Sequence, residues 1–190
     1  MSQASLASST RIRNTLLLAA ALSLSACTPQ SAPRETTQVS SGSALEESGN
    51  QSSGTVGNEN AKVGQIWWFA LPIPLNTSNG DIEITDVSIV RPAKGMKILE
   101  YGAYDLEDTE GLPLMALEGA GDAPDFKKLK NYATEPVVVK AHKESEIFFV
   151  ARMKINSSPK GTSRYCRFDY TQEKRSYSQT LDCELDLQTN

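Results

Sequence analysis

From about residue 64 onward, apolar and polar residues alternate in short runs, which is the pattern of strands that bury one face. The clearest run is IFFVARMKI, in which Ile147, Phe149, Ala151, Met153 and Ile155 fall on one face, and Arg152 and Lys154 on the other. Further strand-like runs are GQIWWFALPIPL, DIEITDVSIV, MKILEYGAY, PVVVKA and the weaker LPLMALEG. Turn signals such as Asn79-Gly80 follow roughly every 8–15 residues. About seven short strands and almost no helix predict an all-β, antiparallel β-sandwich.

Two local departures from this alternation carry their own predictions. Ile82 and Ile84 share one parity, whereas Val87 and Ile89 have the other, so we expect a β-bulge near Thr85-Asp86. The segment DAPDFKKLKNYA, residues 122–133, predicts one or two helical turns, with Phe126 and Leu129 facing inward three residues apart.

The last two runs predict a hairpin. In RYCRFDY the residues Cys166, Phe168 and Tyr170 share a face, and in TLDCELDL the residues Leu181, Cys183, Leu185 and Leu187 do. A turn around EKRS, midway between the cysteines, would place Cys166 opposite Cys183 and Phe168 opposite Leu181. Both apolar faces would then meet the core in the same register.

Residues 28–62 differ sharply from this domain. The stretch consists mainly of Ser, Thr, Gly, Gln, Asn, Glu and Pro and contains no aromatic residue. A segment of this composition buries too little apolar surface to offset the entropy of ordering. We therefore expect a disordered tether over residues 27–62 and a folded domain over residues 63–190.

The first 26 residues are typical of a secretory signal peptide. Arg11 and Arg13 precede an apolar run over residues 16–24, and the small residues Ser25 and Ala26 follow it. The run is too short for a transmembrane helix, which needs about 20 apolar residues.

The tetrad Leu24-Ser25-Ala26-Cys27 resembles the lipobox of bacterial lipoproteins. The resemblance covers only the signal region, and it implies cleavage before Cys27, a diacylglyceryl group on its thiol and acylation of the new amino terminus. Two or more acyl chains hold a protein stably on a membrane, at about 0.8 kcal/mol per buried CH₂. Cys27 is therefore the expected anchor on the extracytoplasmic side of a membrane. The alternative is an ordinary cleaved signal with an incidental cysteine.

With Cys27 carrying lipid, Cys166 and Cys183 remain in an oxidising compartment, where a disulfide is the natural pairing. The alternative is two free buried thiols. The rhythm of strands and the late pair of Tyr/Cys strands also resemble the immunoglobulin-like domains of small bacterial cell-surface lipoproteins. That resemblance implies a fold and no particular activity.

Charge and motifs exclude several classes of function. A formal net charge of −4 and a pI near 5.1 argue against a nucleic-acid-binding protein. The chain has neither a G-x-S-x-G nucleophile elbow nor a P-loop. Its single histidine, His142, lies in the polar turn KAHKESE, and the acidic run EYGAYDLEDTEG lacks EF-hand spacing. We expect no catalytic residue, no metal ligand and no cofactor.

The stretch ITDVSIVRPAKGMKI superficially resembles the opening of periplasmic copper chaperones of cupredoxin-like fold, which hold Cu(I) with paired His and Met ligands. Here His142 and the methionines Met96, Met115 and Met153 do not have the spacing of that family. Because the departure is at the ligands themselves, the copper function is not carried over. Metal handling stays only as the alternative function, with an envelope hydrolase in third place.

One feature of the domain points to a partner. Trp67, Trp68 and Phe69 are consecutive, so on a strand only one of the two tryptophans points into the core. The other, next to Phe69, is a candidate for an exposed aromatic patch that binds a partner or a glycan. The alternative is that the polar tether or a neighbouring loop covers it. The sequence thus predicts a lipid-anchored, non-enzymatic binding or accessory module for another protein of the cell envelope.

Overall fold

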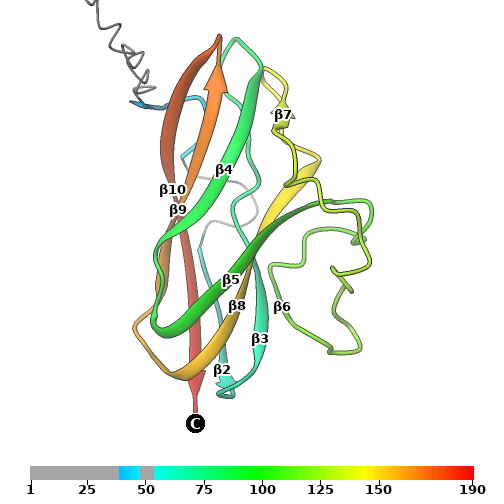
Figure 1. The fold of residues 1–190 in the computed structure, drawn as a ribbon, viewed down its shortest axis with the longest axis vertical. Coiled ribbons are helices and arrows are strands. Elements are labelled where there is room, and N and C mark those ends of the chain that lie inside the picture. The colour runs from blue at the N-terminus through cyan, green and yellow to red at the C-terminus, as the bar shows by residue number, and fades with distance from the viewer. Residues whose placement is uncertain (1–38, 48–53) are drawn as a thin grey trace, which may run out of the picture. The chain divides into compact units, whose positions relative to one another are not determined.

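The computed structural model describes residues 39–47 and 54–190, which form one β-sandwich of two sheets (Figure 1). The strands are β1 (Ser40–Ser41), β2 (Thr55–Ala61), β3 (Ile66–Ala70), β4 (Ile82–Arg91), β5 (Lys94–Asp105), β6 (Met115–Leu117), β7 (Val137–Val139), β8 (Ile147–Lys160), β9 (Ser163–Gln172) and β10 (Arg175–Thr189). The predicted signal peptide and Cys27 lie outside the described residues.

The six-stranded sheet has the order β1-β10-β9-β4-β7, and β2 joins it further along the same edge of β10 as β1. The four-stranded sheet has the order β5-β8-β3-β6. The inner faces of both sheets supply the main core, which contains Phe69, Phe149, Ile155, Phe168 and Leu185 among its most buried members. The predicted all-β sandwich is therefore confirmed, although ten strands rather than seven are described and β1 and β2 pair in parallel with β10.

The predicted β-bulge is also confirmed. The pairing of β4 with β9 shifts register between Ile84 and Asp86, so that Thr85 is the extra residue. Ile84 and Val87 are both buried despite their opposite parity, whereas Thr85 and Asp86 are exposed. Because of the bulge, the apolar residues of β4 face the core on both sides of the point where the apolar–polar alternation changes parity.

The predicted disulfide joins Cys166 to Cys183, with their Cα atoms 5.8 Å apart. The predicted register of the hairpin is wrong by two residues: Cys166 lies opposite Leu181, and Phe168 lies opposite Gln179. A two-residue turn at Glu173-Lys174, both with positive φ, replaces the four-residue turn that we expected. A register shift between Leu181 and Glu184 then brings Cys183 back beside Cys166. A slip of two residues keeps every side chain on its predicted face.

The predicted boundary at residue 63 is wrong, because segments assigned to the tether belong to the sandwich. β2 pairs with β10 over Thr55 to Ala61, and Leu45 is 2% exposed in the core. The Gln179 side chain accepts from the Leu45 N–H (2.9 Å) and donates to its carbonyl (2.6 Å), as a neighbouring strand would. Polar composition conceals this contribution because backbone pairing, rather than a row of apolar side chains, holds β2 in place.

A close approach secures the first of these segments. The Ala44 N–H donates to the Tyr170 hydroxyl at 3.0 Å. A Cβ on Gly42 would collide with that hydroxyl, so only glycine fits beside the ring. Residues 39–47 are therefore fixed against β10 and β9 by specific contacts.

The expected helical turns at 122–133 are wrong, since the described residues contain no helix. A single turn closed by the Lys128 N–H and the Asp125 carbonyl (2.8 Å) stands in their place. Phe126 nevertheless faces inward, at 2% exposed. No helix within residues 39–47 and 54–190 is long and apolar enough to cross a membrane.

We predict that a chain starting at residue 63 is less stable than one starting at residue 36 by about 3 kcal/mol or more. The shorter chain loses the buried Leu45 side chain and leaves the Gln179 amide without its partner. Urea unfolding of both chains measures the difference, with Gln179→Ala in the longer chain as a milder variant. Equal unfolding midpoints for the two chains would show that residues 36–62 do not stabilise the fold.

Candidate functional site

The four-stranded sheet is apolar on both faces, unlike the six-stranded sheet. Its outer face carries a second hydrophobic cluster of buried residues: Trp68, Ala70, Ile73, Tyr104, Ala116, Phe126, Phe148 and Val150. In β8, Phe148 and Val150 belong to this cluster, while Phe149 and Ala151 belong to the main core. A sheet with two apolar faces has to be covered on both.

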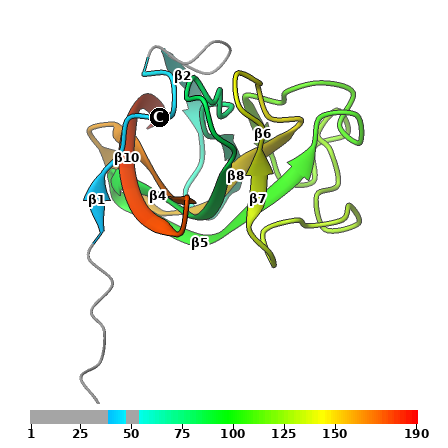
Figure 2. The same ribbon diagram turned by 90° about the horizontal axis from the view of Figure 1, so that it is seen from above.

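The cover is the long connection between β5 and β7, residues 106–136, here called the excursion (Figures 1 and 2). It contributes β6 to the edge of the sheet and then crosses the outer face. Phe126 is the residue that it inserts: its ring centroid lies 4.6 Å from that of Trp68 and 4.8 Å from that of Tyr104. Phe148 adds a third ring contact at 6.4 Å. Each aromatic pair contributes about 0.5–1.5 kcal/mol beyond simple burial, so Phe126 fixes the excursion to the sheet.

The far end of the excursion is fixed by backbone contacts to β5. The Ala103 N–H donates to the Asn131 side chain (3.0 Å), and the Tyr132 N–H donates to the Ala103 carbonyl (2.8 Å). These bonds use the outward-facing backbone groups of Ala103 and close the edge of β5 at that residue.

An ion-pair network lies beside the aromatic cluster. Arg152 makes a bidentate pair with Glu118, at 2.6 Å for Nε–Oε2 and 2.9 Å for Nη2–Oε1, and its guanidinium lies 5.7 Å from the centre of the Trp68 ring. Lys127 Nζ binds the same carboxylate at 2.8 Å, and Glu100 binds Arg152 at 3.2 Å. The hydrogen bonds from Arg152, followed by those from Lys127, hold the pKa of Glu118 at about 2. Glu118 is thus a permanently ionised acceptor at neutral pH and not a proton donor.

Two hollows flank residues 120–124 of the excursion. The outer hollow, of about 490 Å³, is lined by residues that include Trp68, Glu118, Phe126 and Lys127. The inner hollow, of about 320 Å³, lies between β6 and β2 and is lined by residues that include Asn58, Trp67, Met115 and Leu117. Ala120, Ala123 and Pro124 line both. The two hollows therefore open next to each other, on either face of β6.

Strand β6 itself has an open edge. Its ladder with β3 pairs Trp68 with Ala116, and the bonds Ala70 N–H to Leu114 carbonyl and Glu118 N–H to Ile66 carbonyl bracket that pair. In an antiparallel ladder the residues between hydrogen-bonded pairs point their backbone groups away from the partner strand. These are Met115 and Leu117. Within the described part of the chain, the Met115 N–H and carbonyl and the Leu117 N–H have no hydrogen-bond partner.

The candidate aromatic patch is not exposed, and the alternative that a neighbouring loop covers the second tryptophan is confirmed. Trp67, Trp68 and Phe69 are 6%, 4% and 0% exposed, because the strand that carries them lies in a sheet covered on both faces. Trp67 and Phe69 pack in the main core, and Trp68 packs under Phe126. Trp67 and Trp68 still reach the site, each as part of the lining of one hollow.

The other charged candidates have local partners. Of the basic run, Lys127 pairs with Glu118, Lys128 pairs with Asp125 at 2.8 Å, and Lys130 lies over the Tyr132 ring. His142 is exposed in its turn, 3.0 Å from the Asn79 side-chain oxygen. None of these contacts joins His142 to the ion-pair network of the site.

The potential copper ligands are dispersed. Met153 is fully buried in the main core, while Met96 and Met115 pack at its margin. The turn that carries His142 ends where β8 begins, at Ile147. Met96 lies opposite Ile155, eight residues further along β8, which is about 26 Å of strand. Over residues 39–47 and 54–190, no three His, Cys, Asp or Glu side chains converge as a metal site requires.

Sequence reasoning missed Phe126 as the anchor of the site, the Arg152–Glu118 pair and the open edge of β6. A signal for the first was present: in IFFVA both parities are apolar, which indicates a strand buried on both faces, and a second cover was therefore needed. The open edge of β6 had no signal in the sequence, because it depends on which strand lies next to β6.

Comparisons of the chain with family models, with curated proteins and with solved structures give no match.

We predict that Phe126→Ala destabilises the protein by about 3–5 kcal/mol, the usual cost of removing a buried aromatic side chain. Urea unfolding followed by tryptophan fluorescence measures the loss, since Trp68 is in contact with the deleted ring. Lys128→Ala, two residues away on the exposed side, is the matched control and should change stability little. A small effect of Phe126→Ala would mean that the excursion is held by other contacts.

The Glu118 network predicts a pH dependence of stability. The pKa of Glu118 falls from 4.5 to about 2 on folding, so its contribution is complete above pH 4.5 and is lost as the pH falls towards 2. We expect Glu118→Gln to lower the free energy of unfolding by roughly 2–3 kcal/mol at pH 7 and by much less at pH 2. Unfolding curves at several pH values, with Glu135→Gln as control, test this. A constant difference between variant and parent at all pH values would contradict it.

Proposed function

We propose that the chain is a lipid-anchored protein of the cell envelope whose β-sandwich is a non-enzymatic binding module, and that the side formed by β6 and the excursion is its binding surface. One observation carries this proposal: a 31-residue connection, residues 106–136, is held against the sheet by specific contacts and leaves, within the described residues, two adjacent hollows and an open strand edge. Binding sites are concave and largely preformed, with apolar walls and a few polar groups.

The electrostatics of the site favour binding over acid–base catalysis. A general acid or base works best when its pKa lies near the working pH. Glu118 has a pKa of about 2 and is bound by two cations, Arg152 and Lys127. A carboxylate in this state can orient a ligand but does not exchange protons at neutral pH.

The anchor is supported by the lipobox-like tetrad and by the disulfide. A disulfide in a domain of this size is typical of an extracytoplasmic compartment. Only residues 28–38 separate Cys27 from Val39, the first residue described in the sandwich. At 3.3–3.6 Å per residue this stretch spans at most about 40 Å. The proposed partner is therefore in the membrane or close to its surface.

The anchor is tested by metabolic labelling with an alkyne fatty acid and membrane fractionation. The parent chain should carry the label and sediment with membranes, whereas Cys27→Ser should do neither while keeping its disulfide. Label on the Cys27→Ser variant, or an unlabelled parent released to the soluble fraction, would contradict the proposal.

The binding surface is tested by photocrosslinking in intact cells. A photoreactive residue replaces Leu114, which is exposed beside β6, or Thr180, which is exposed on the outer face of the six-stranded sheet. We expect a defined crosslinked species from position 114 that is weaker from position 180 and weaker in the Cys27→Ser background. Equal products from both positions, or none from either, would count against a binding module that uses this side.

A further inference from the structure

The two edge strands of the four-stranded sheet, β5 and β6, differ in how their outward backbone groups are bound. The edge of β5 is closed at Ala103, whose N–H and carbonyl bind Asn131 and Tyr132. The edge of β6 is open at Met115 and Leu117, as described above. Exposed edges are templates for pairing with another extended chain, and proteins usually block them. Here the excursion binds the outward groups of β5 at Ala103, whereas within the described residues nothing binds the outward N–H and carbonyl of Met115, beside the two hollows.

A strand added to β6 would have a place for its side chains on both faces. Side chains alternate along a strand, so those on the inner face would enter the hollow lined by Trp67, Met115 and Leu117. Those on the outer face would lie towards the hollow that contains Glu118 and Asp125, whose carboxylates already pair with Arg152, Lys127 and Lys128. Because β6 has only three residues, the paired stretch would be short. Gly119 and Gly121 have open space around their Cα atoms, so the segment after β6 presents little steric hindrance.

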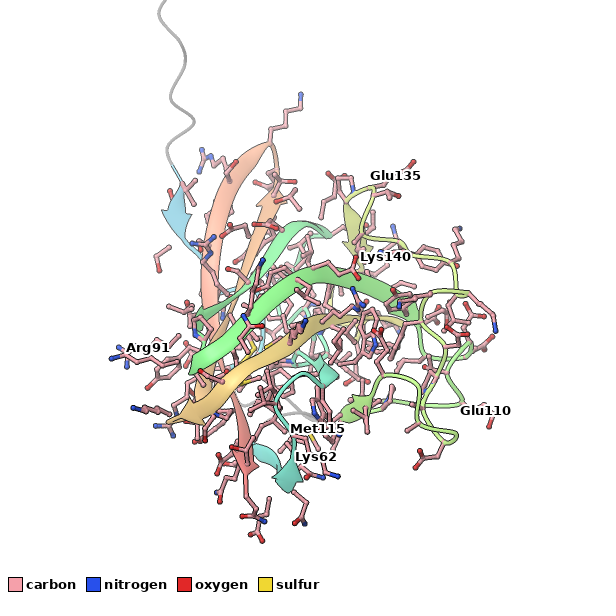
Figure 3. The ribbon with its side chains drawn as sticks, turned by 60° about the horizontal axis from the view of Figure 1, so that its bottom comes forward. Lys62, Arg91, Glu110, Met115, Glu135 and Lys140 are labelled. Atoms are coloured by element: carbon pink, nitrogen blue, oxygen red, sulfur yellow. A yellow bond between two sulfur atoms is a disulfide. The ribbon has the colours of Figure 1, made fainter. Side chains whose placement is uncertain are left out.

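The excursion that contains β6 carries more acidic than basic residues. From Asp105 to Phe126 the chain has no basic residue, and its acidic residues are Asp105, Glu107, Asp108, Glu110, Glu118, Asp122 and Asp125. Ion pairs within the described residues use Glu118 and Asp125 and leave the other five without a basic partner. Asp122 lines the inner hollow itself, and Glu110 lies at the outer tip of the excursion (Figure 3). Over residues 106–136 the excursion has seven acidic residues and three lysines, Lys127, Lys128 and Lys130, so its net charge is −4.

We propose that β6 binds a short, extended and cationic segment of another protein by strand addition, with its apolar residues in the inner hollow and its basic residues towards the acidic excursion. This inference rests on the proposed function and specifies the chemistry of the partner. Strand addition obtains affinity from main-chain hydrogen bonds and specificity from pockets for alternate side chains. A second copy of this chain fits less well, because pairing β6 with β6 would bring two acidic excursions together.

Three ten-residue peptides serve as probes of the purified domain, residues 36–190. One alternates lysine and valine, the second alternates glutamate and valine, and the third is the Lys–Val peptide with alternate backbone nitrogens methylated. Calorimetric titration should show binding of the first peptide that weakens at high salt, and at least about tenfold weaker binding of the other two, equivalent to 1.4 kcal/mol. In NMR spectra the amides of Met115 and Leu117 should shift and exchange more slowly in the complex.

Two variants place the binding at this edge. Met115→Pro removes the outward N–H without breaking the ladder to β3 and should weaken binding of the Lys–Val peptide about tenfold. Asp122→Lys should weaken it as well, whereas Asp182→Lys, exposed on the other sheet, should not. Thermal unfolding of each variant checks that the fold is kept. Equal binding of the N-methylated peptide, preference for the Glu–Val peptide, or a dimer of the domain formed through β6 would each overturn the proposal.

The two proposals fail in different ways. If position 114 crosslinks a partner in cells but the Lys–Val peptide does not bind the domain, the binding module stands and strand addition by a cationic segment is refuted. If the peptide binds at Met115 and Leu117 but the Cys27→Ser variant is still lipid-labelled, the edge site stands and the proposed anchor is refuted.

Discussion

The outer face of the four-stranded sheet is apolar and has to be covered, and the rest of the site follows from this constraint. Trp68, Phe148 and Val150 project from that face, opposite a main core that already uses the other side of the same strands. The excursion meets the need with a single deeply inserted ring, Phe126, and a bidentate ion pair between Glu118 and Arg152. Because these contacts hold it at a few points and not along its whole length, hollows remain beside them. The same packing that completes the fold thus shapes a surface suited to binding.

The closing strand β10 has the corresponding role in the other sheet. It pairs with β9 on one side and with β1 and β2 on the other, and it carries one half of the disulfide. Its Gln179 amide bridges the interval between β1 and β2 by binding the backbone of Leu45. The polar segment after the proposed anchor is therefore shorter than its composition indicates, and the domain lies correspondingly closer to the membrane in our proposal.

The sequence predicted those features that depend on local pattern. The sandwich, the bulge at Thr85 and the pairing of Cys166 with Cys183 follow from parity and from the position of cysteines on apolar faces. The features that were mispredicted depend on segments distant in the chain. β2 is stabilised by its neighbour β10 and not by its own apolar residues. The exposure of the second tryptophan was left open by the sequence for the same reason, because the burial of Trp68 depends on Phe126, 58 positions later. The open edge of β6 depends on an absence of neighbours, which no local pattern records.

The account depends most directly on β6 being a fixed strand with one free edge, and amide hydrogen exchange measures this residue by residue. We predict slow exchange for Trp68 and Ala116, whose backbone groups pair across the ladder, and fast exchange for Met115 and Leu117 in the same three-residue strand. Such an alternation would show an edge that is both ordered and available. Slow exchange at Met115 and Leu117 would mean that another segment already covers the edge, and uniformly fast exchange would mean that the strand is not fixed; either result would contradict the account.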